Sequence, residues 1–105
     1  MSSKKHQYLA DFYKAFSHPA RLQILDLLRH GERCVCEIVP EMGMEQPNVS
    51  RHLSILRKEG LLGYRKDGLR VIYWVRDHRI YQLIDSGGDI LKSFWKEKNE
   101  EGTYF

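Results

Sequence analysis

Cysteine is scarce in this chain of 105 residues: only Cys34 and Cys36 occur, separated by one valine. A pair so close in sequence is a poor framework for a structural disulfide, because it closes a very small ring, and it more often marks metal or redox chemistry. The chain also lacks a secretory h-region and any apolar run near the about 18 residues that suggest a membrane span. We therefore expect a cytoplasmic protein with no membrane partner.

The net charge of +3 is too small to identify a partner, but the charges are unevenly distributed. Residues 51–79 contain eight lysines and arginines against three acidic residues, whereas residues 31–50 contain one arginine against four acidic residues. A basic band beside an acidic band is typical of an oriented nucleic-acid surface. The length predicts a single domain over 1–105 with a modest core, and small helical domains of this size often dimerise.

Apolar periodicity predicts a mainly α fold with one small β-hairpin. Helices are expected over about 6–16, 19–29, 36–42, 47–58 and 78–98, and strands over 62–65 and 71–75. The Lys66-Asp67-Gly68 segment between the strands carries the Asp-Gly signal of a hairpin turn. Gly87-Gly88 interrupts the last helical pattern, so we expect that helix to be kinked or split there.

The helix expected over 47–58 has one apolar face, because Val49, Leu53 and Leu56 are spaced by four and three residues. Its other face would suit an ordinary solvated helix, but its residue types also suit DNA. Asparagine can read adenine, arginine can fork onto guanine, and serine and lysine can hold phosphates. The candidate DNA-binding residues of this segment are Gln46, Pro47, Asn48, Ser50, Arg51, His52, Ser54 and Lys58.

Two helices joined by a tight turn, the second with a DNA-suited face, indicate a helix-turn-helix over about 36–58. The hairpin over 62–75 follows directly, and its tip carries Arg65, Lys66 and Arg70. An ordinary solvated turn would also fit, but behind a helix-turn-helix we interpret this hairpin as a wing along the DNA backbone. The first and last helices carry more apolar surface than a small monomer can bury. We therefore predict a winged helix-turn-helix that binds a double-stranded DNA operator as a homodimer.

Two other functional classes can be judged from the same residues. An enzyme would need a nucleophile–base pair or paired carboxylates in a pocket, and no such pattern rises above chance, so we expect neither catalysis nor an obligatory cofactor. A winged helix that binds only protein would present an acidic or apolar recognition face. This face instead carries Asn48, Arg51 and Lys58.

The segment from Ser17 to Val75 resembles the ArsR/SmtB family of small dimeric winged-helix repressors that sense metals and metalloids. The matching stretches are Pro19 to Leu25, Cys34 to Ile38, Gln46 to Leu53, Leu56 to Leu62 and Arg65 to Gly68, in the same order and spacing. The resemblance implies an obligate dimer through the first and last helices, with the helix from Gln46 to Lys58 in the major groove. It also implies a repressor that an effector releases from its operator.

The effector is the less specific part of the resemblance. Cys34 and Cys36 match the Cys-Val-Cys motif of the arsenic-type and cadmium-type branches. The third thiol of the arsenic-type site would lie where this chain has Val39, and the arm over 1–7 lacks the extra thiols of the cadmium-type site. The resemblance therefore implies a metal site formed by two cysteines rather than a full set of thiolates.

Thiolates select soft acceptors such as trivalent arsenic or antimony, cadmium, lead or monovalent copper. Pro40 is tolerated only in the first turn of a helix, so the helix begins near Cys36 and the stretch from Cys34 can be partly extended. Both sulfurs can then turn toward one ion. A third ligand would come from solvent, an exogenous thiol, Glu37 or His6. Two alternatives stay open: a thiol-redox switch, and cysteines that act only as small apolar fillers.

Overall fold

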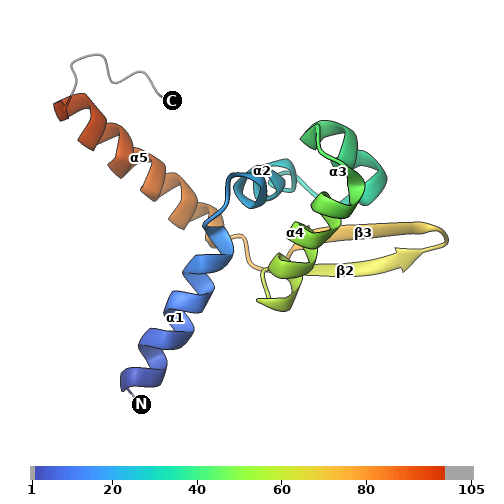
Figure 1. The fold of residues 1–105 in the computed structure, drawn as a ribbon, viewed down its shortest axis with the longest axis horizontal. Helices are drawn as coiled ribbons and strands as arrows, with labels where there is room; N and C mark the ends of the chain where they lie inside the picture. Colours follow the sequence, from blue (N-terminus) through green and yellow to red (C-terminus); the bar gives the residue numbers. More distant parts are fainter. Residues whose placement is uncertain (1, 99–105) are drawn as a thin grey trace.

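The computed structural model describes the backbone of residues 2–98 and the side chains of residues 4–97. Over this range the chain forms five α-helices and a three-stranded antiparallel sheet (Figure 1). The elements are α1 (Ser2–Phe16), α2 (Pro19–Leu27), β1 (Arg33–Cys34), α3 (Val35–Met42), α4 (Gln46–Lys58), β2 (Leu62–Asp67), β3 (Arg70–Val75) and α5 (Ile80–Lys98). The predicted fold class, mainly α with a winged helix-turn-helix, is confirmed. None of the described helices combines the length and the apolar character needed to cross a bilayer.

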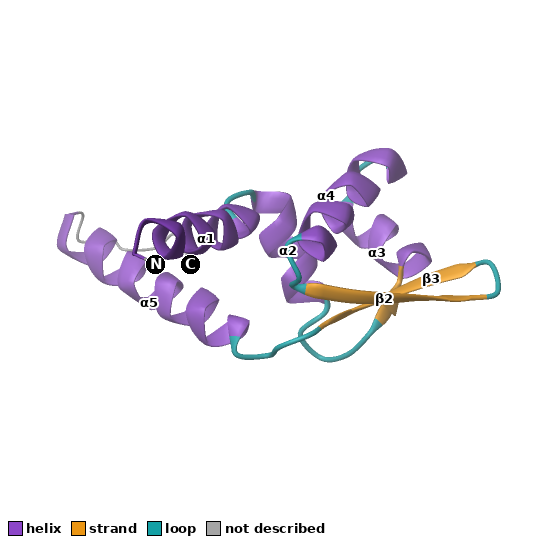
Figure 2. Ribbon diagram, turned by 90° about the horizontal axis from the view of Figure 1, so that it is seen from below, coloured by secondary structure: helices purple, strands orange, loops and turns teal. Residues whose placement is uncertain are grey.

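The helices fall into two groups (Figure 1). α1 and α5 occupy one end of the molecule, whereas α3, α4 and the β2–β3 hairpin lie at the other end. Figure 2 shows α2, α3 and α4 on one side of the hairpin, whose loop extends past them. The elements predicted to read DNA are therefore separated along the chain's longest axis from those predicted to form the dimer.

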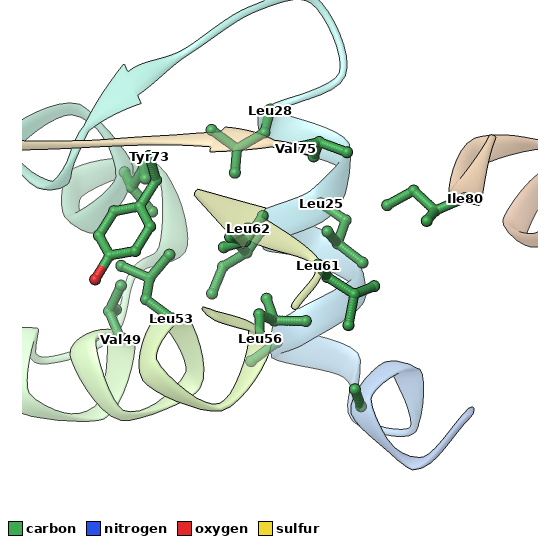
Figure 3. Close-up of a cluster of buried hydrophobic side chains, with 14 of the residues drawn as sticks. Leu25, Leu28, Val49, Leu53, Leu56, Leu61, Leu62, Tyr73, Val75 and Ile80 are labelled. Atoms are coloured by element: carbon green, nitrogen blue, oxygen red, sulfur yellow. The ribbon is translucent and has the colours of Figure 1, made fainter. Parts of the chain in front are cut away.

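The core lies where α2, α4 and the sheet meet (Figure 3). The predicted apolar stripe of α4 is confirmed, because Val49, Leu53 and Leu56 each have 0 % of their surface exposed. Burying such side chains fully stabilises the fold by roughly 1.5–3 kcal/mol each. Leu25 of α2 and Tyr73 of β3 belong to the same cluster, so α4 is held against both the helix before it and the wing.

The sheet differs from the sequence prediction in two places. Asp67 pairs with Arg70, so the hairpin loop consists of Gly68 and Leu69 rather than being centred on Asp67. Gly68 has a φ of 64°, a conformation that glycine adopts without the steric cost other residues meet. The unpredicted strand β1 adds Arg33 and Cys34 to the edge of β3, and two residues are too few to produce a period-two pattern.

The predicted split of the last helix at Gly87-Gly88 is wrong, because α5 runs as one helix from Ile80 to Lys98. A glycine costs about 1 kcal/mol in a helix relative to alanine, but it keeps its backbone N–H and does not by itself end the helix. The start of α5 is well anchored, since Ile80 and Tyr81 are buried. Asp85, one turn further, accepts two hydrogen bonds from Arg29 beyond α2, at 3.1 and 3.0 Å.

Candidate DNA-binding surface and thiol pair

The helix-turn-helix is built by α3 and α4. α3 ends at Gly43, whose φ of 63° places it in the left-handed region typical of a helix C-terminus. α4 then begins with a proline in its first turn, where the missing N–H costs nothing. Of the predicted contacts on α4, Gln46, Pro47, Ser50, Arg51 and Lys58 are exposed, whereas Asn48 and Ser54 are half-buried.

His52 departs from the predicted set of DNA contacts, because its side chain is buried with only 4 % exposed. Its ring lies 4.3 Å from that of His18, and its Nδ1 accepts a hydrogen bond from Arg21 at 3.2 Å. Burial lowers the pKa of His52 below its usual value, and the nearby cations lower it further. The prediction of His52 as a groove contact is therefore wrong: the ring points into the protein and packs α4 against α2.

Arg21 connects three helices at this point. Its guanidinium donates to the carbonyl oxygens of Ala15 at 2.7 Å and Lys14 at 3.3 Å, both in the last turn of α1, as well as to His52 of α4. Arg21 of α2 thus donates hydrogen bonds to two carbonyl groups at the end of α1 and holds the imidazole ring of His52 on α4 in place. Sequence patterns did not identify this role, because the partners lie 6, 7 and 31 residues from Arg21.

The wing carries its predicted basic residues on exposed positions, but they are not equivalent. Arg65 donates two hydrogen bonds to Glu32, at 2.8 and 2.7 Å, and this pairing lowers the pKa of the Glu32 carboxyl. Arg70 lies 3.8 Å from Glu37 of α3. The charge of Arg65 is therefore largely committed to an intramolecular partner that sequence reasoning missed, since the two residues are 33 positions apart.

Cys34 and Cys36 come together at the start of α3. Cys34 is the helix N-cap, with extended backbone (φ −79°, ψ 158°), and its N–H donates to the Glu37 carboxylate at 3.0 Å. The two Cα atoms are 5.1 Å apart, and the sulfurs are joined as a disulfide. The expectation that so short a separation disfavours a disulfide is wrong, because the predicted extended stretch brings the Cα atoms within the usual range of about 4.4–6.8 Å.

The pair is asymmetric in its surroundings. Cys34 has 1 % of its surface exposed, whereas Cys36 faces outward. Within the described residues no third histidine, cysteine or acidic side chain gathers with them into a metal-binding group. Of the candidate third ligands, Glu37 is already engaged by the N–H of Cys34, and His6 lies on the exposed surface of α1.

An apolar groove lies between α1, α2 and α5, far from the thiol pair. It has a volume of about 380 Å³ and is lined by Tyr13, Phe16, Leu22, Leu83, Ile84, Gly87, Gly88 and Leu91. Further apolar side chains are exposed next to it, including Ile90 at 53 % and Phe94 at 58 %. Exposed apolar surface of this extent usually marks a protein–protein contact.

Comparison with known proteins gives a consistent result. Residues 18–64 match the family model described as bacterial regulatory protein, arsR family. The chain is 42% identical over 82 residues to an HTH-type transcriptional regulator of Methanocaldococcus jannaschii, covering 77% of this chain and 92% of the relative. It is 33% identical over 88 residues to the arsenical resistance operon repressor of Staphylococcus xylosus, covering 84% of each.

A solved structure is similar over most of the chain. The solution structure of a homodimeric winged helix-turn-helix DNA-binding domain from Mycobacterium bovis, a possible ArsR-family regulator, superimposes with a TM-score of 0.75. The two sequences are 33% identical, and the match covers 83% of this chain and 83% of the other.

Proposed function

The chain is a winged helix-turn-helix transcriptional repressor of the arsR family, and we propose that Cys34 and Cys36 control its DNA binding by capturing a thiophilic metal or metalloid ion. Arsenite, antimonite and cadmium are the proposed effectors, because reduced thiolates prefer soft acceptors. The observation that carries the proposal is the convergence of the two sulfurs at the first turn of α3. One ion can therefore bridge both sulfurs after reduction.

The placement of the pair supports a route from effector to DNA. α3 packs its buried Ile38 and Met42 into the same core as Leu53 of α4, so a change in the first turn of α3 bears on the recognition helix. A second connection passes from the N–H of Cys34 through Glu37 toward the wing. An effector shifts the equilibrium only by its differential affinity for the two states, and a coupling of about 1–3 kcal/mol suffices to vacate an operator.

We further propose a symmetric dimer on its operator. The apolar groove between α1, α2 and α5 would receive the same elements of a second copy, as the homodimeric relative suggests. Each α4 would then enter the major groove in one half-site, with the two half-sites separated by one helical turn, about 34 Å, or slightly more. The proposed contacts on α4 are Gln46, Pro47, Asn48, Ser50, Arg51, Ser54 and Lys58.

Arg51 is the proposed base-reading side chain, because it is exposed on α4 and arginine can fork onto guanine. Arg51→Ala should weaken binding to the specific operator by about 1–3 kcal/mol and relax the preference at one base pair. Binding measured on the operator and on random DNA of equal length distinguishes the roles. An equal loss on both would make Arg51 a phosphate contact instead.

The wing should contribute phosphate contacts that appear in the salt dependence of binding. Lys66→Ala or Arg70→Ala should flatten the slope of log affinity against log salt by roughly one counterion, about 0.9. Glu32→Gln should act in the opposite direction, because it releases Arg65 from its ion pair. Affinities measured at several salt concentrations decide this, and unchanged slopes in all three variants would mean that the wing tip does not touch DNA.

The proposed function is tested by releasing operator DNA from reduced protein with arsenite, antimonite or cadmium. We expect release from the wild type and none from Cys34→Ser or Cys36→Ser, because a single thiolate cannot chelate the ion. Each variant must first bind the operator as the wild type does in the absence of effector. Equal release from the wild type and both variants would contradict a role for the pair.

A dithiol–disulfide switch is the second candidate, and the observed disulfide between Cys34 and Cys36 favours it. In this case a mild oxidant such as peroxide would change operator affinity in the absence of any metal or metalloid. Peroxide added in the same titration separates the two candidates. Release by peroxide but by none of the ions supports the switch, whereas release by neither leaves the cysteines with a structural role.

A further inference from the structure

A cavity opens directly beside the thiol pair. It has a volume of about 480 Å³ and lies between α3, the start of α4 and the wing. Cys36 lines it, and apolar side chains from two elements, among them Val39 of α3 and Val71 of β3, form part of its wall. Other parts of the wall come from Gln46 and Ser50 of α4 and Arg70 of the wing. The space next to the exposed cysteine is therefore bounded by the elements proposed to hold DNA.

The valence of trivalent arsenic indicates which kind of ligand this cavity suits. Trivalent arsenic forms three bonds, and the thiol pair supplies only two sulfurs. Among the described residues no third ligand of the histidine, cysteine or acidic types joins Cys34 and Cys36. Inorganic arsenite bound here would keep an oxygen in its third position. An arsenical with one carbon substituent has that position filled already, and only its two remaining oxygens exchange with thiols.

Building on the proposed function, we infer that the preferred effector is a monosubstituted trivalent organoarsenical, R–As(OH)₂, whose carbon substituent occupies the cavity beside Cys36. The two thiols form two As–S bonds, and the two As–OH bonds break. Each thiol proton leaves with a hydroxyl as water, so two waters are released and no electrons are transferred. The disulfide offers no thiol, and the reaction therefore starts from the dithiol form.

The substituent also provides a way to release DNA. A group in this cavity would share its wall with Gln46 and Arg70, which belong to the two elements that must approach the same duplex. A larger substituent fills more of the cavity and buries more apolar surface, so its effect should exceed that of a small one. Release should therefore strengthen from arsenite to methylarsonous acid to phenylarsonous acid.

The experiment uses the whole chain, reduced with a phosphine that is then removed, and bound to fluorescent operator DNA. The probes are arsenite, methylarsonous acid and phenylarsine oxide, which hydrates to phenylarsonous acid. We expect half-release by the phenyl compound at about tenfold to hundredfold lower concentration than by arsenite, which is about 1.4–2.8 kcal/mol. Intact-protein mass spectrometry should show one arsenic per chain, bound through both cysteines.

Two substitutions at Val39 provide matched controls. Val39 lies three residues after Cys36 on the same helix face, so Val39→Cys supplies a third sulfur and should improve the response to arsenite selectively. Val39→Phe fills the cavity and should weaken the response to the phenyl compound while leaving that to arsenite unchanged. Operator binding without any arsenical shows that each variant is folded, and if Val39→Phe fails that check, the probe series and Val39→Cys decide.

The outcomes separate this inference from the function on which it rests. Equal half-release by arsenite and the phenyl compound, with no effect of Val39→Phe, would overturn the inference and leave the metalloid-responsive repressor intact. Absence of release by every arsenical, and also by antimonite and cadmium in the same assay, would overturn the proposed function instead. In that case the mass spectra still test whether the carbon substituent occupies the cavity. A preference for the phenyl adduct over the arsenite adduct would support this placement, and equal formation of the two adducts would overturn it.

Discussion

Replacing Phe94 with glutamate should convert the protein to a monomer and lower its operator affinity by about a hundredfold or more, equivalent to about 2.8 kcal/mol. Phe94 lies near the end of α5 with 58 % of its surface exposed, beyond the apolar groove that α5 forms with α1 and α2. In a symmetric dimer each substitution occurs twice, and burying an unpaired carboxylate in an apolar contact is strongly unfavourable.

The loss of DNA binding follows from losing the second reading helix. A dimer holds two copies of α4 against two half-sites at once. A monomer therefore loses the additional operator affinity that comes from linking the two binding events. Ser93→Glu is the matched control, because Ser93 is exposed on a neighbouring face at the same depth of α5. Sedimentation and operator titration should show a dimer for the control and a monomer for Phe94→Glu. A monomeric wild type that binds its operator normally would contradict the dimer itself.

Local patterns predicted the elements of this fold well where the signal was long. The stripe of Val49, Leu53 and Leu56 identified both the helix and its buried side, since three apolar residues at helical spacing leave few alternatives. Shorter signals failed. β1 has only two residues, and Gly87-Gly88 indicated a break that the anchored start of α5 overrides.

The candidate site was predictable in composition but not in its contacts. The extended backbone at Cys34 was predicted correctly, but the argument from Pro40 was wrong, because Pro40 lies inside α3 and not in its first turn. The ion pair between Glu32 and Arg65 was not predicted, because tertiary contacts across 33 residues leave no trace in spacing. His52 illustrates the same limit: it lies next to outward-facing Arg51, and only the packing of α2 on α4 shows that its ring is buried.

The burial of His52 leads to a second large effect, on stability rather than on assembly. Arg21→Ala should lower the free energy of unfolding by about 2–4 kcal/mol, because charged hydrogen bonds are lost and the buried acceptor on His52 is left without a partner. Arginine only donates, so Nδ1 of His52 must accept the bond from Arg21, which requires that nitrogen to be unprotonated. The carbonyls of Lys14 and Ala15 at the end of α1 lose their donor in the same substitution.

Arg51→Ala is the matched control, since it removes an exposed arginine one residue away from His52 and should change stability by less than about 0.5 kcal/mol. Urea unfolding of both variants should therefore separate a loss of stability from a loss of DNA reading. A double-mutant cycle with His52→Phe measures the coupling directly, because residues in contact show non-additive effects of about 0.5–3 kcal/mol. Additive losses, or an Arg21→Ala variant as stable as the wild type, would mean that the guanidinium does not hold the recognition helix in place.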